Sequence, residues 1–210
     1  MGAERPHPFV RLLLLRHGES TWNAVGRWQG HADPPLSTIG AVQARAAAPA
    51  LKGIDAVWCS DLIRARQTAE LCAPPGVTVR TDPRLRERDV GQWTGLTRDT
   101  IEGRYPGWIA DGRRPTGWEP DERVAARAWR ALRGVVAALE PGGHALVVSH
   151  GGLIRAVEAS LGTPSRPVPN LGGVWLHHAA GTFGLGEQAM PADRAARAAP
   201  ASEPVVTAPE

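Results

Sequence analysis

The amino-acid sequence predicts an α/β fold built on a mainly parallel sheet that carries helices on both faces. Strongly apolar runs of strand length alternate along the chain with amphipathic or alanine-rich helical stretches, and this alternation is typical of parallel sheets covered on both sides. A length of 210 residues suits one large domain that buries most of its surface. No internal repeat is visible in the sequence, which argues against a solenoid or a propeller.

The first half of the chain is expected to supply three strands and two helices. The strand segments are leucine-rich or β-branched and lie at residues 9–15, 54–59 and 77–81. Alanine-rich residues 37–51 predict the first helix. Residues 61–72 place their apolar side chains on one face of a second helix, for which Ser60 is the expected N-cap. The thiol of Cys72 then belongs to the core.

The second half continues the same alternation. Thr97 is expected to cap a short helix over residues 97–105. Pro120 opens a long helix, because proline suits the first turn and the two acidic residues after it favour the positive end of the helix dipole. Two strands and a helix between them follow, at residues 145–149, 174–178 and 153–161. Residues 188–210 are rich in alanine and proline without periodicity, so we predict a mobile, disordered tail behind a domain of residues 1–187.

The composition argues against several classes of protein. The net charge is only +3, and acids are interleaved with the arginines, whereas nucleic-acid binders concentrate positive charge in a stripe. The longest apolar run, residues 12–15, is too short for a membrane span or a signal peptide. Two isolated cysteines, Cys59 and Cys72, indicate a reducing compartment. We therefore expect an unexported, cytoplasmic protein with no nucleic-acid or membrane partner.

Two histidines follow strongly apolar strands. Arg16-His17-Gly18 ends the first strand, and Ser149-His150-Gly151 ends the strand at residues 145–149. The carboxyl ends of parallel strands meet at one edge of a sheet, where ligands bind, so we expect the two histidines to lie together. Glycine lets backbone N–H groups approach an anion, and the N-terminus of the helix that follows adds a positive dipole end. A single histidine on an apolar strand is more often structural, and it is the pair that indicates a site.

Arg64 is expected to reach the same edge. It lies one turn into the helix at residues 61–72, and its planar guanidinium beside Arg16 is what bidentate phosphate binding requires. The alternative is a surface ion pair of Arg64 with Asp61 or Glu70. Two local arginine clusters, at residues 84–88 and 113–114, are further candidates for binding a small anion.

Glu87 is the candidate proton source. Cleavage of a phosphate ester requires that the leaving oxygen be protonated as its bond breaks, and Glu87 lies in a turn-rich stretch after a strand. Close to several arginines, it serves only if burial or the negative charge of the substrate favours its protonated form. The alternative is that Glu87 pairs with Arg86 or Arg88.

Five motifs, in this order and spacing, carry a resemblance to a known family. They are Arg16-His17-Gly18-Glu19 with Asn23, Gly26-Arg27-Trp28-Gln29-Gly30, Ser60-Asp61-Leu62 with Arg64, Leu85-Arg86-Glu87 with Gly91, and Ser149-His150-Gly151-Gly152. Over residues 12–176 the chain resembles the histidine phosphatase superfamily in its phosphoglycerate mutase-like branch. The resemblance implies a three-layer α/β/α sandwich and makes residues 1–187 a histidine phosphatase domain.

The resemblance also implies roles for these residues. His17 would be the nucleophile that becomes phosphohistidine, and Glu87 would be the proton donor. Arg16, Arg64 and His150 would hold the phosphoryl group, and substrate contacts are expected from Asn23, Gln29, Gly30 and Gly151. A neutral imidazole nitrogen can attack phosphorus in line while cationic donors stabilise the charge on the equatorial oxygens. We therefore expect neither a metal ion nor a cofactor.

The sequence favours a phosphatase over a mutase. In mutases of the family the acidic residue begins a pattern that resembles Glu-x-x-Tyr-Gly, whereas here Glu87 is followed by Arg88-Asp89-Val90. Mutases also carry a longer basic insertion after the acid, whereas here only 33 residues separate Glu87 from Asp121. A more open site admits water to the phosphohistidine. We expect a phosphoric monoester hydrolase that acts on a small phosphorylated metabolite. The alternatives are a phosphoglycerate mutase and a phosphate-ester binding module without turnover.

The substrate is less constrained. The family's Gly-Gly-Glu-Ser before the long helix is replaced by Gly117-Trp118-Glu119-Pro120. Tryptophans would stack on a sugar or else belong to the core or the rim of the site, namely Trp28, Trp93, Trp108 and Trp118. With Arg113 and Arg114 for a second acidic group, phosphoglycerate or glucosyl-3-phosphoglycerate would suit. The remaining polar residues are expected to be structural or solvated, namely His31, His144, His177, His178, Arg123, Arg127 and Arg130. The oligomeric state, monomer or homodimer, is left open.

Overall fold

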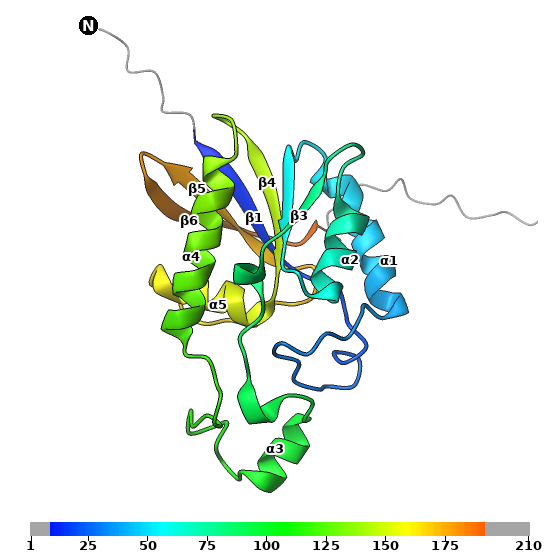
Figure 1. The fold of residues 1–210 in the computed structure, drawn as a ribbon, viewed down its shortest axis with the longest axis vertical. Coiled ribbons are helices and arrows are strands. Elements are labelled where there is room, and N and C mark those ends of the chain that lie inside the picture. Colours follow the sequence, from blue (N-terminus) through cyan, green and yellow to red (C-terminus); the bar gives the residue numbers. More distant parts are fainter. Residues whose placement is uncertain (1–8, 192–210) are drawn as a thin grey trace, which may run out of the picture.

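A computed structural model describes residues 9–191, in which a six-stranded sheet lies between two helical layers (Figure 1). The strand order is β3-β2-β4-β1-β5-β6. The strands are β1 (Val10–Arg16), β2 (Ala56–Cys59), β3 (Val79–Thr81), β4 (His144–Ser149), β5 (Gly173–Ala179) and β6 (Thr182–Ala189). The first four pair in parallel, and β5 and β6 are antiparallel to their neighbours. The expectation of a mainly parallel sheet is confirmed.

Side chains of β1 alternate between two hydrophobic cores. Leu12 and Leu14 pack under α4 (Asp121–Ala137) and α5 (Gly151–Ser160). Leu13 and Leu15 pack under the helices of the opposite layer, α1 (Thr38–Ala47) and α2 (Ile63–Cys72). All four leucines are at most 1% exposed, because a strand covered on both faces needs apolar side chains at every position. The predicted three-layer architecture is therefore correct.

The segment between β3 and α4 leaves the sheet and forms a lobe beyond its carboxyl edge (Figure 1). It contains short 3₁₀ turns at Pro83–Leu85 and Gly91–Trp93 and the helix α3 (Arg98–Arg104). Thr97 caps α3 by accepting a hydrogen bond from the Thr100 N–H, as expected. Trp93 is completely buried and contacts the rings of Trp28 and Trp118 edge-on. This aromatic cluster packs the lobe against the loop that follows β1.

Three boundaries differ from the sequence prediction. Ser60 is not the N-cap of α2, which begins at Ile63 with Leu62 at the cap position, although the Ser60 hydroxyl does accept from the Leu62 N–H. The first helix ends at Ala47 and continues only as a 3₁₀ turn to Leu51. The helix α5 starts at Gly151, two residues before the expected point, because the low helix propensity of two glycines hides its first turn.

The edge strand β6 was not predicted. Its central Gly184 and Gly186 have weak strand propensity, and its side chains are exposed or only half-buried, so the segment lacks a clear pattern. A side chain at position 186 would collide with the His177 ring, since an ideal Cβ there lies 2.3 Å from His177 Nε2. Gln188 and Ala189, placed in the tail by the sequence, belong to β6. The remainder of the expected tail, from residue 192 onward, lies outside the described residues.

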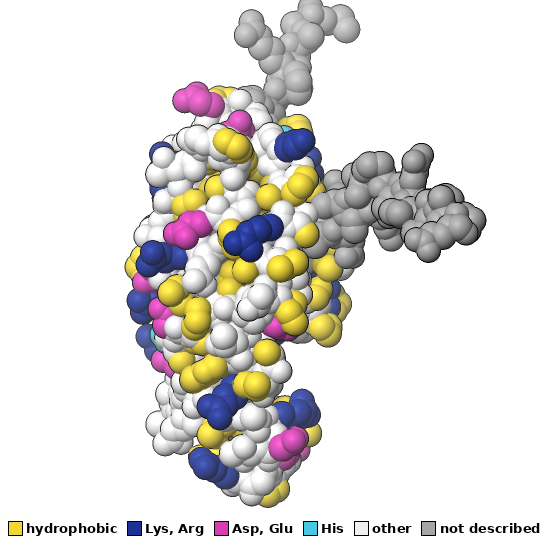
Figure 2. All heavy atoms as spheres, turned by 90° about the vertical axis from the view of Figure 1, so that its right-hand side faces the viewer, with side chains coloured by type: hydrophobic (Ala, Val, Ile, Leu, Met, Phe, Trp, Pro, Cys, Tyr) yellow, Lys and Arg dark blue, Asp and Glu magenta, His cyan; other side chains and the backbone are white. Residues whose placement is uncertain are grey.

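The surface and the cysteines follow the sequence analysis. On the face drawn in Figure 2, basic and acidic side chains are both scattered among apolar ones and form no basic stripe. Within residues 9–191, no helix combines the length and the apolar character that crossing a membrane would need. Cys59 and Cys72 are free and buried, and burial raises the pKa of each thiol to about 12. Both behave as core residues rather than as reactive thiols.

Candidate active site

The adjacent parallel strands β1 and β4 bring the two histidines together. Their register pairs Arg16 with Ser149, so His17 and His150 follow at the same carboxyl edge. The two ring centroids are 5.1 Å apart. The backbone N–H of His17 also donates to the Ser149 carbonyl, at 3.0 Å, which extends the ladder to the histidine itself. The convergence predicted from the two apolar strands is present.

His17 is held with one ring nitrogen unprotonated, as a nucleophile needs. Its Nδ1 lies 2.6 Å from the Gly18 carbonyl oxygen, an acceptor, so Nδ1 carries the proton and Nε2 keeps its lone pair. The Nε–H of Arg64 donates to that Nε2 at 3.2 Å. Burial, together with the charges of Arg64 and Arg16, lowers the pKa of His17 well below its usual value of 6.5. The ring is therefore neutral at physiological pH, as in-line attack on phosphorus requires.

His150 is a buried polar group without a partner. It is 0% exposed, and neither Nδ1 nor Nε2 has a hydrogen-bond partner within the described residues. Burial and the neighbouring charge of Arg64 lower its pKa well below 6.5. An unsatisfied buried imidazole costs stability, and a ligand oxygen placed between the two histidines would satisfy it.

Arg64 is fully buried and rigidly held, so the surface ion pair considered as its alternative is wrong. Its Nη1 and Nη2 donate to the carbonyls of Ala32 and Gly30, at 2.8 and 3.0 Å. Burial lowers its pKa to about 10, which leaves it charged at neutral pH. Arg16 is anchored by donating from Nη1 to the Val168 carbonyl, at 2.7 Å, and burial lowers its pKa as well. Two fixed guanidinium groups therefore flank His17.

Glu87 lies near His17 and forms neither of the ion pairs, with Arg86 or Arg88, that were considered for it. Its Oε1 accepts from the Arg88 backbone N–H at 2.7 Å, and its Oε2 accepts from the Gly152 N–H at 3.1 Å. Within the part of the chain described, Arg86 pairs instead with Asp61, and the Arg88 side chain pairs with Asp121. The carboxylate is thus positioned by backbone donors from its own loop and from the start of α5.

The expected substrate contacts also line the cavity. Asn23 Oδ1 accepts from the Ser20 backbone N–H, and Gln29 Oε1 accepts from the Ser20 hydroxyl, which leaves both amide NH₂ groups available to a ligand. Gly30 has a φ of +49°, and a Cβ there would lie 2.9 Å from Val90 Cγ2, so glycine is required on both counts. Gly151 begins α5 and offers its backbone N–H at the helix N-terminus.

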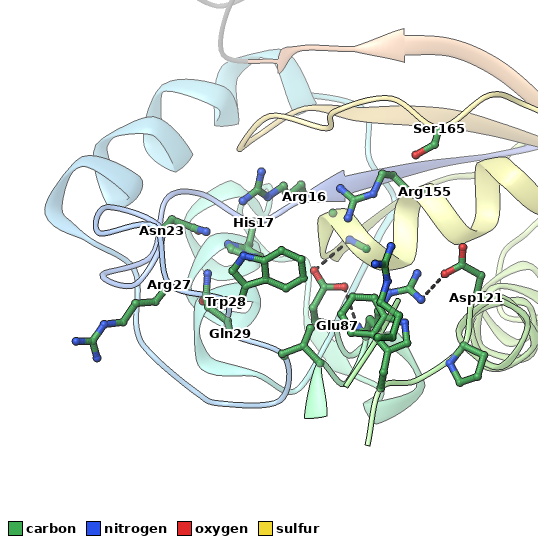
Figure 3. Close-up of a pocket in the computed structure, with 18 of the residues that line it drawn as sticks. Arg16, His17, Asn23, Arg27, Trp28, Gln29, Glu87, Asp121, Arg155 and Ser165 are labelled. Carbon is green, nitrogen blue, oxygen red and sulfur yellow. Dashed lines mark hydrogen bonds and ion pairs between the residues drawn. The ribbon is translucent and has the colours of Figure 1, made fainter. Parts of the chain in front are cut away.

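Of the site residues described so far, all but His150 line a cavity of about 790 Å³. Figure 3 shows His17, Asn23 and Gln29 on one side of it, Glu87 at its centre and Asp121 and Ser165 at the far end. Trp28 and Trp118 contribute half-buried aromatic walls, whereas Trp93 lies behind them in the core. Of the four tryptophans considered for stacking on a sugar, the structure places these two on the cavity.

Both arginine clusters considered as anion sites are largely neutralised. Arg84 pairs with Asp82, and Arg86 and Arg88 pair with Asp61 and Asp121. Arg113 pairs with Asp111, and Arg114 lies over the Trp118 ring at the rim of the cavity. The arginines around His17, Arg16 and Arg64, have no such ion pair within the described residues.

Arg127 was expected on the solvated face of the long helix, and this prediction is wrong. It uses all five of its N–H bonds: two go to Glu119, and the others go to the carbonyls of Arg84, Arg86 and Glu87. Burial alone would raise the pKa of Glu119, but the Arg127 hydrogen bonds hold it below the usual value. Because the side chain is only 13% exposed, Arg127 positions the backbone that carries Glu87.

Two other residues of the site were not found from the sequence. Asn170 donates from Nδ2 to the His17 carbonyl at 2.9 Å and belongs to the proline-rich loop before β5. Arg155, on α5, lines the cavity beside Arg16. Neither lies in a motif, and only the packing of loops around the sheet edge brings them there.

The arrangement is suited to transferring a phosphoryl group. The Nε2 lone pair of His17, two arginines and a helix N-terminus lie at one end of the cavity, and the Glu87 carboxyl group is held beside that helix N-terminus by the Gly152 N–H. Within residues 9–191, no cluster of three or more His, Cys, Asp or Glu side chains could hold a metal ion.

The chain resembles known proteins over most of its length. A sequence profile of the histidine phosphatase superfamily (branch 1) matches residues 12–174. A glucosyl-3-phosphoglycerate phosphatase from Mycobacterium tuberculosis is 40% identical over 180 residues, which cover 78% of this chain and 81% of that protein. A protein from Cronobacter sakazakii named "Probable phosphoglycerate mutase GpmB" is 39% identical over 167 residues, covering 74% of this chain and 77% of that one. The solved structure of a phosphoglycerate mutase from Bacillus anthracis superimposes with a TM-score of 0.80 at 25% identity, covering 93% of this chain and 99% of that one.

Proposed function

This chain belongs to the histidine phosphatase superfamily, and from that membership we propose that it hydrolyses a small phosphate monoester through a phosphohistidine on His17. The observation that carries the proposal is the state of the His17 ring. Its Nδ1–H is committed to the Gly18 carbonyl, its Nε2 lone pair faces Arg64, and the ring of His150 lies 5.1 Å away between centroids. This is the geometry of a nucleophile in a preformed anion site.

In the first step the Nε2 lone pair of His17 attacks phosphorus, and the bond from phosphorus to the ester oxygen breaks. The leaving oxygen takes a proton from Glu87, which becomes a carboxylate. Arg16, Arg64 and His150 donate hydrogen bonds to the equatorial oxygens, with further donors from Asn23 and the Gly151 N–H.

In the second step water attacks the phosphorus of the phosphohistidine. Glu87, now ionised, accepts a proton from that water, the P–N bond breaks and its electron pair returns to Nε2. The products are inorganic phosphate and the starting enzyme. The positive charge that a metal ion would supply is supplied by Arg16 and Arg64, so the proposed reaction uses no metal and no cofactor.

Access of water favours hydrolysis over mutase chemistry. The cavity is lined in part by residues that are exposed to solvent, including Arg27, Gly112, Glu122 and Ser165. The 33 residues between Glu87 and Asp121 form the lobe around α3 and leave this opening. A mutase must protect its phosphoenzyme from water, so this opening is the observation that ranks hydrolysis first. Phosphoglycerate mutation stays the second candidate because of the 39% identity to a mutase-named relative.

The substrate that we propose is a phosphorylated glyceric acid, with or without a sugar. A cavity of about 790 Å³ exceeds the needs of a three-carbon ester, and Trp28 and Trp118 offer aromatic walls of the kind that stack on a sugar ring. Glucosyl-3-phosphoglycerate, the substrate in the name of the 40% identical relative, has this composition. We propose that the enzyme acts on this metabolite in the cytoplasm, in keeping with its two free, buried cysteines.

The test is phosphate release in the presence of EDTA from sugar phosphates, phosphoglycerates, glucosyl-3-phosphoglycerate and nucleotides. The native protein is compared with His17→Ala and, as a matched control, with His144→Ala at the opposite end of β4. We expect release that only the first variant abolishes. Isomerisation of 3-phosphoglycerate without release would identify a mutase. Tight binding of vanadate with no turnover of any ester would identify a binding module.

A further inference from the structure

Arg155 is a half-buried arginine of the cavity that the proposed reaction does not use. It lies one turn after Gly151 on α5, and its side chain lines the cavity next to Arg16 (Figure 3). An ideal Cβ on Gly151 would be 3.5 Å both from Arg155 Nη1 and from Arg16 Cδ, which places the two arginines side by side at the helix N-terminus. The positive charge of Arg155 also contributes to lowering the pKa of Arg16, after burial.

The Arg155 guanidinium lacks the partners that the other inner arginines have. Arg16 donates to the Val168 carbonyl, and Arg64 donates to two carbonyls and to His17. Across residues 9–191, no hydrogen bond or ion pair forms to the side chain of Arg155, although it is half-buried. A planar fork of N–H donors held free inside a cavity is suited to a planar, bidentate acceptor.

The three arginines nearest to His17 and Gly151 carry one more positive charge than a phosphate monoester balances. Arg16, Arg64 and Arg155 supply three positive charges, and Glu87 is neutral when it acts as the proton donor. The other carboxylates of the wall are at the far end, where Asp121 pairs with Arg88 and Glu122 is exposed. A phosphate monoester dianion balances two of the three charges. It already has donors in Arg16, Arg64, His150, Asn23 and Gly151, so Arg155 is left for another group.

We propose that Arg155 determines substrate specificity by binding a carboxylate of the substrate, so that the enzyme selects phosphorylated hydroxy acids over phosphate esters that carry no carboxylate. The inference rests on the proposed function and assigns a residue to it. Because Arg155 adjoins Arg16, the carboxylate must lie within a few bonds of the phosphoryl group, as it does in a phosphorylated three-carbon acid. A phosphorylated alcohol of the same length leaves the guanidinium unpaired, and that loss is the source of discrimination.

The test compares two ligands that differ only at the group proposed to bind Arg155. They are 3-phosphoglycerate and glycerol 3-phosphate, which carry a carboxylate and a CH₂OH group on the same skeleton. Dissociation constants are measured by titration calorimetry in a His17→Asn background, so that neither ligand is turned over. With Arg155 intact, we expect 3-phosphoglycerate to bind at least about 10-fold more tightly, as for a hydrogen-bonded charge pair.

Three variants separate specificity from folding. Arg155→Gln should bring the ratio of the two dissociation constants to within about 2-fold of one, because it removes the charge. Arg155→Lys, which keeps the charge but loses the fork, should give an intermediate ratio. Arg133→Gln, at an exposed position of α4, is the matched control and should leave the ratio unchanged.

An unchanged ratio in Arg155→Gln, a ratio near one with Arg155 intact, or no binding of either ligand would each overturn the inference. If Arg155→Gln loses binding because it misfolds, it will also lose its thermal unfolding transition. In that case the ratio of dissociation constants in Arg155→Lys decides whether the inference holds. Since these are binding measurements, they are independent of the phosphate-release assay. A chain that releases no phosphate but still prefers 3-phosphoglycerate through Arg155 would contradict the proposed function and support this assignment.

Discussion

A single methyl group at Gly152 would test the role proposed for Glu87. An ideal Cβ on Gly152 lies 2.3 Å from Glu87 Oε1 and 3.0 Å from its Cδ, whereas ordinary contacts begin at 3.4 Å. In Gly152→Ala the carboxyl group must therefore retreat by about 1 Å, which disturbs the hydrogen bond that Oε2 accepts from the residue 152 N–H. A displacement of this size at a catalytic group costs on the order of 10²-fold in rate.

The loss should depend on the leaving group. An alkyl alcohol leaves only when its oxygen is protonated, so kcat/KM for an alkyl phosphate should fall about 10- to 100-fold in Gly152→Ala. p-Nitrophenolate is a stable anion that needs no proton, so kcat/KM for p-nitrophenyl phosphate should fall less than about 3-fold. Steady-state phosphate release with the two esters gives both values.

Gly134→Ala is the matched control, because a Cβ at this position of α4 meets only the far end of Arg84, at 3.9 Å. Alanine is a better helix former than glycine by about 0.5–1 kcal/mol. Helix propensity should therefore not lower the unfolding temperature of either Gly152→Ala or Gly134→Ala. Equal losses for both esters, or no loss for either, would refute the assignment of Glu87 as the proton donor.

Three further predictions concern stability and metal dependence. Burial lowers the pKa of both His17 and His150 below 6.5, so below that pH the unfolded chain binds protons that the folded chain excludes. The free energy of unfolding should therefore be highest above pH 6.5. It should fall below that pH by up to about 2.7 kcal/mol per pH unit for the two histidines together. Urea unfolding between pH 7.5 and 5.5 should show this slope and lose most of it in a variant with asparagine at both positions. Arg127→Met leaves Glu119 unpaired and should lower the free energy of unfolding in urea by about 3 kcal/mol, and Arg127→Lys should lower it by less. A change below about 0.5 kcal/mol in Arg127→Met would contradict the buried network. Phosphate release should be unchanged after dialysis against EDTA, and restoration by added Zn²⁺ or Mg²⁺ of an activity lost there would contradict a metal-free reaction.

Local sequence patterns predicted the sheet and the centre of the site, because both depend on short-range features. The unbroken leucine run of β1 is apolar at every position since both faces of the strand are covered. Parallel pairing of β1 with β4 then forces His17 and His150 to the same edge. Arg64 follows from its place in the first turn of the helix after β2.

The residues that were missed depend on contacts distant in sequence. Arg127 looks like part of a solvated helix face, but its long side chain reaches carbonyls some 40 residues earlier, on the segment leading to Glu87. Asn170 contacts His17 across 153 positions. The strand β6 carries two glycines and no buried stripe, so its pairing with β5 leaves no periodic signal in the sequence.

The central claim, that turnover passes through a phosphohistidine on His17, is tested most directly by trapping that intermediate. The protein is mixed with its best substrate, quenched in alkali, where phosphohistidine survives, and digested for mass spectrometry. The account predicts a phosphoryl group on the peptide that contains His17, at the Nε2 position, formed within one turnover and absent from His17→Ala. Steady phosphate release with no such peptide, and with undiminished release by His17→Ala, would contradict it.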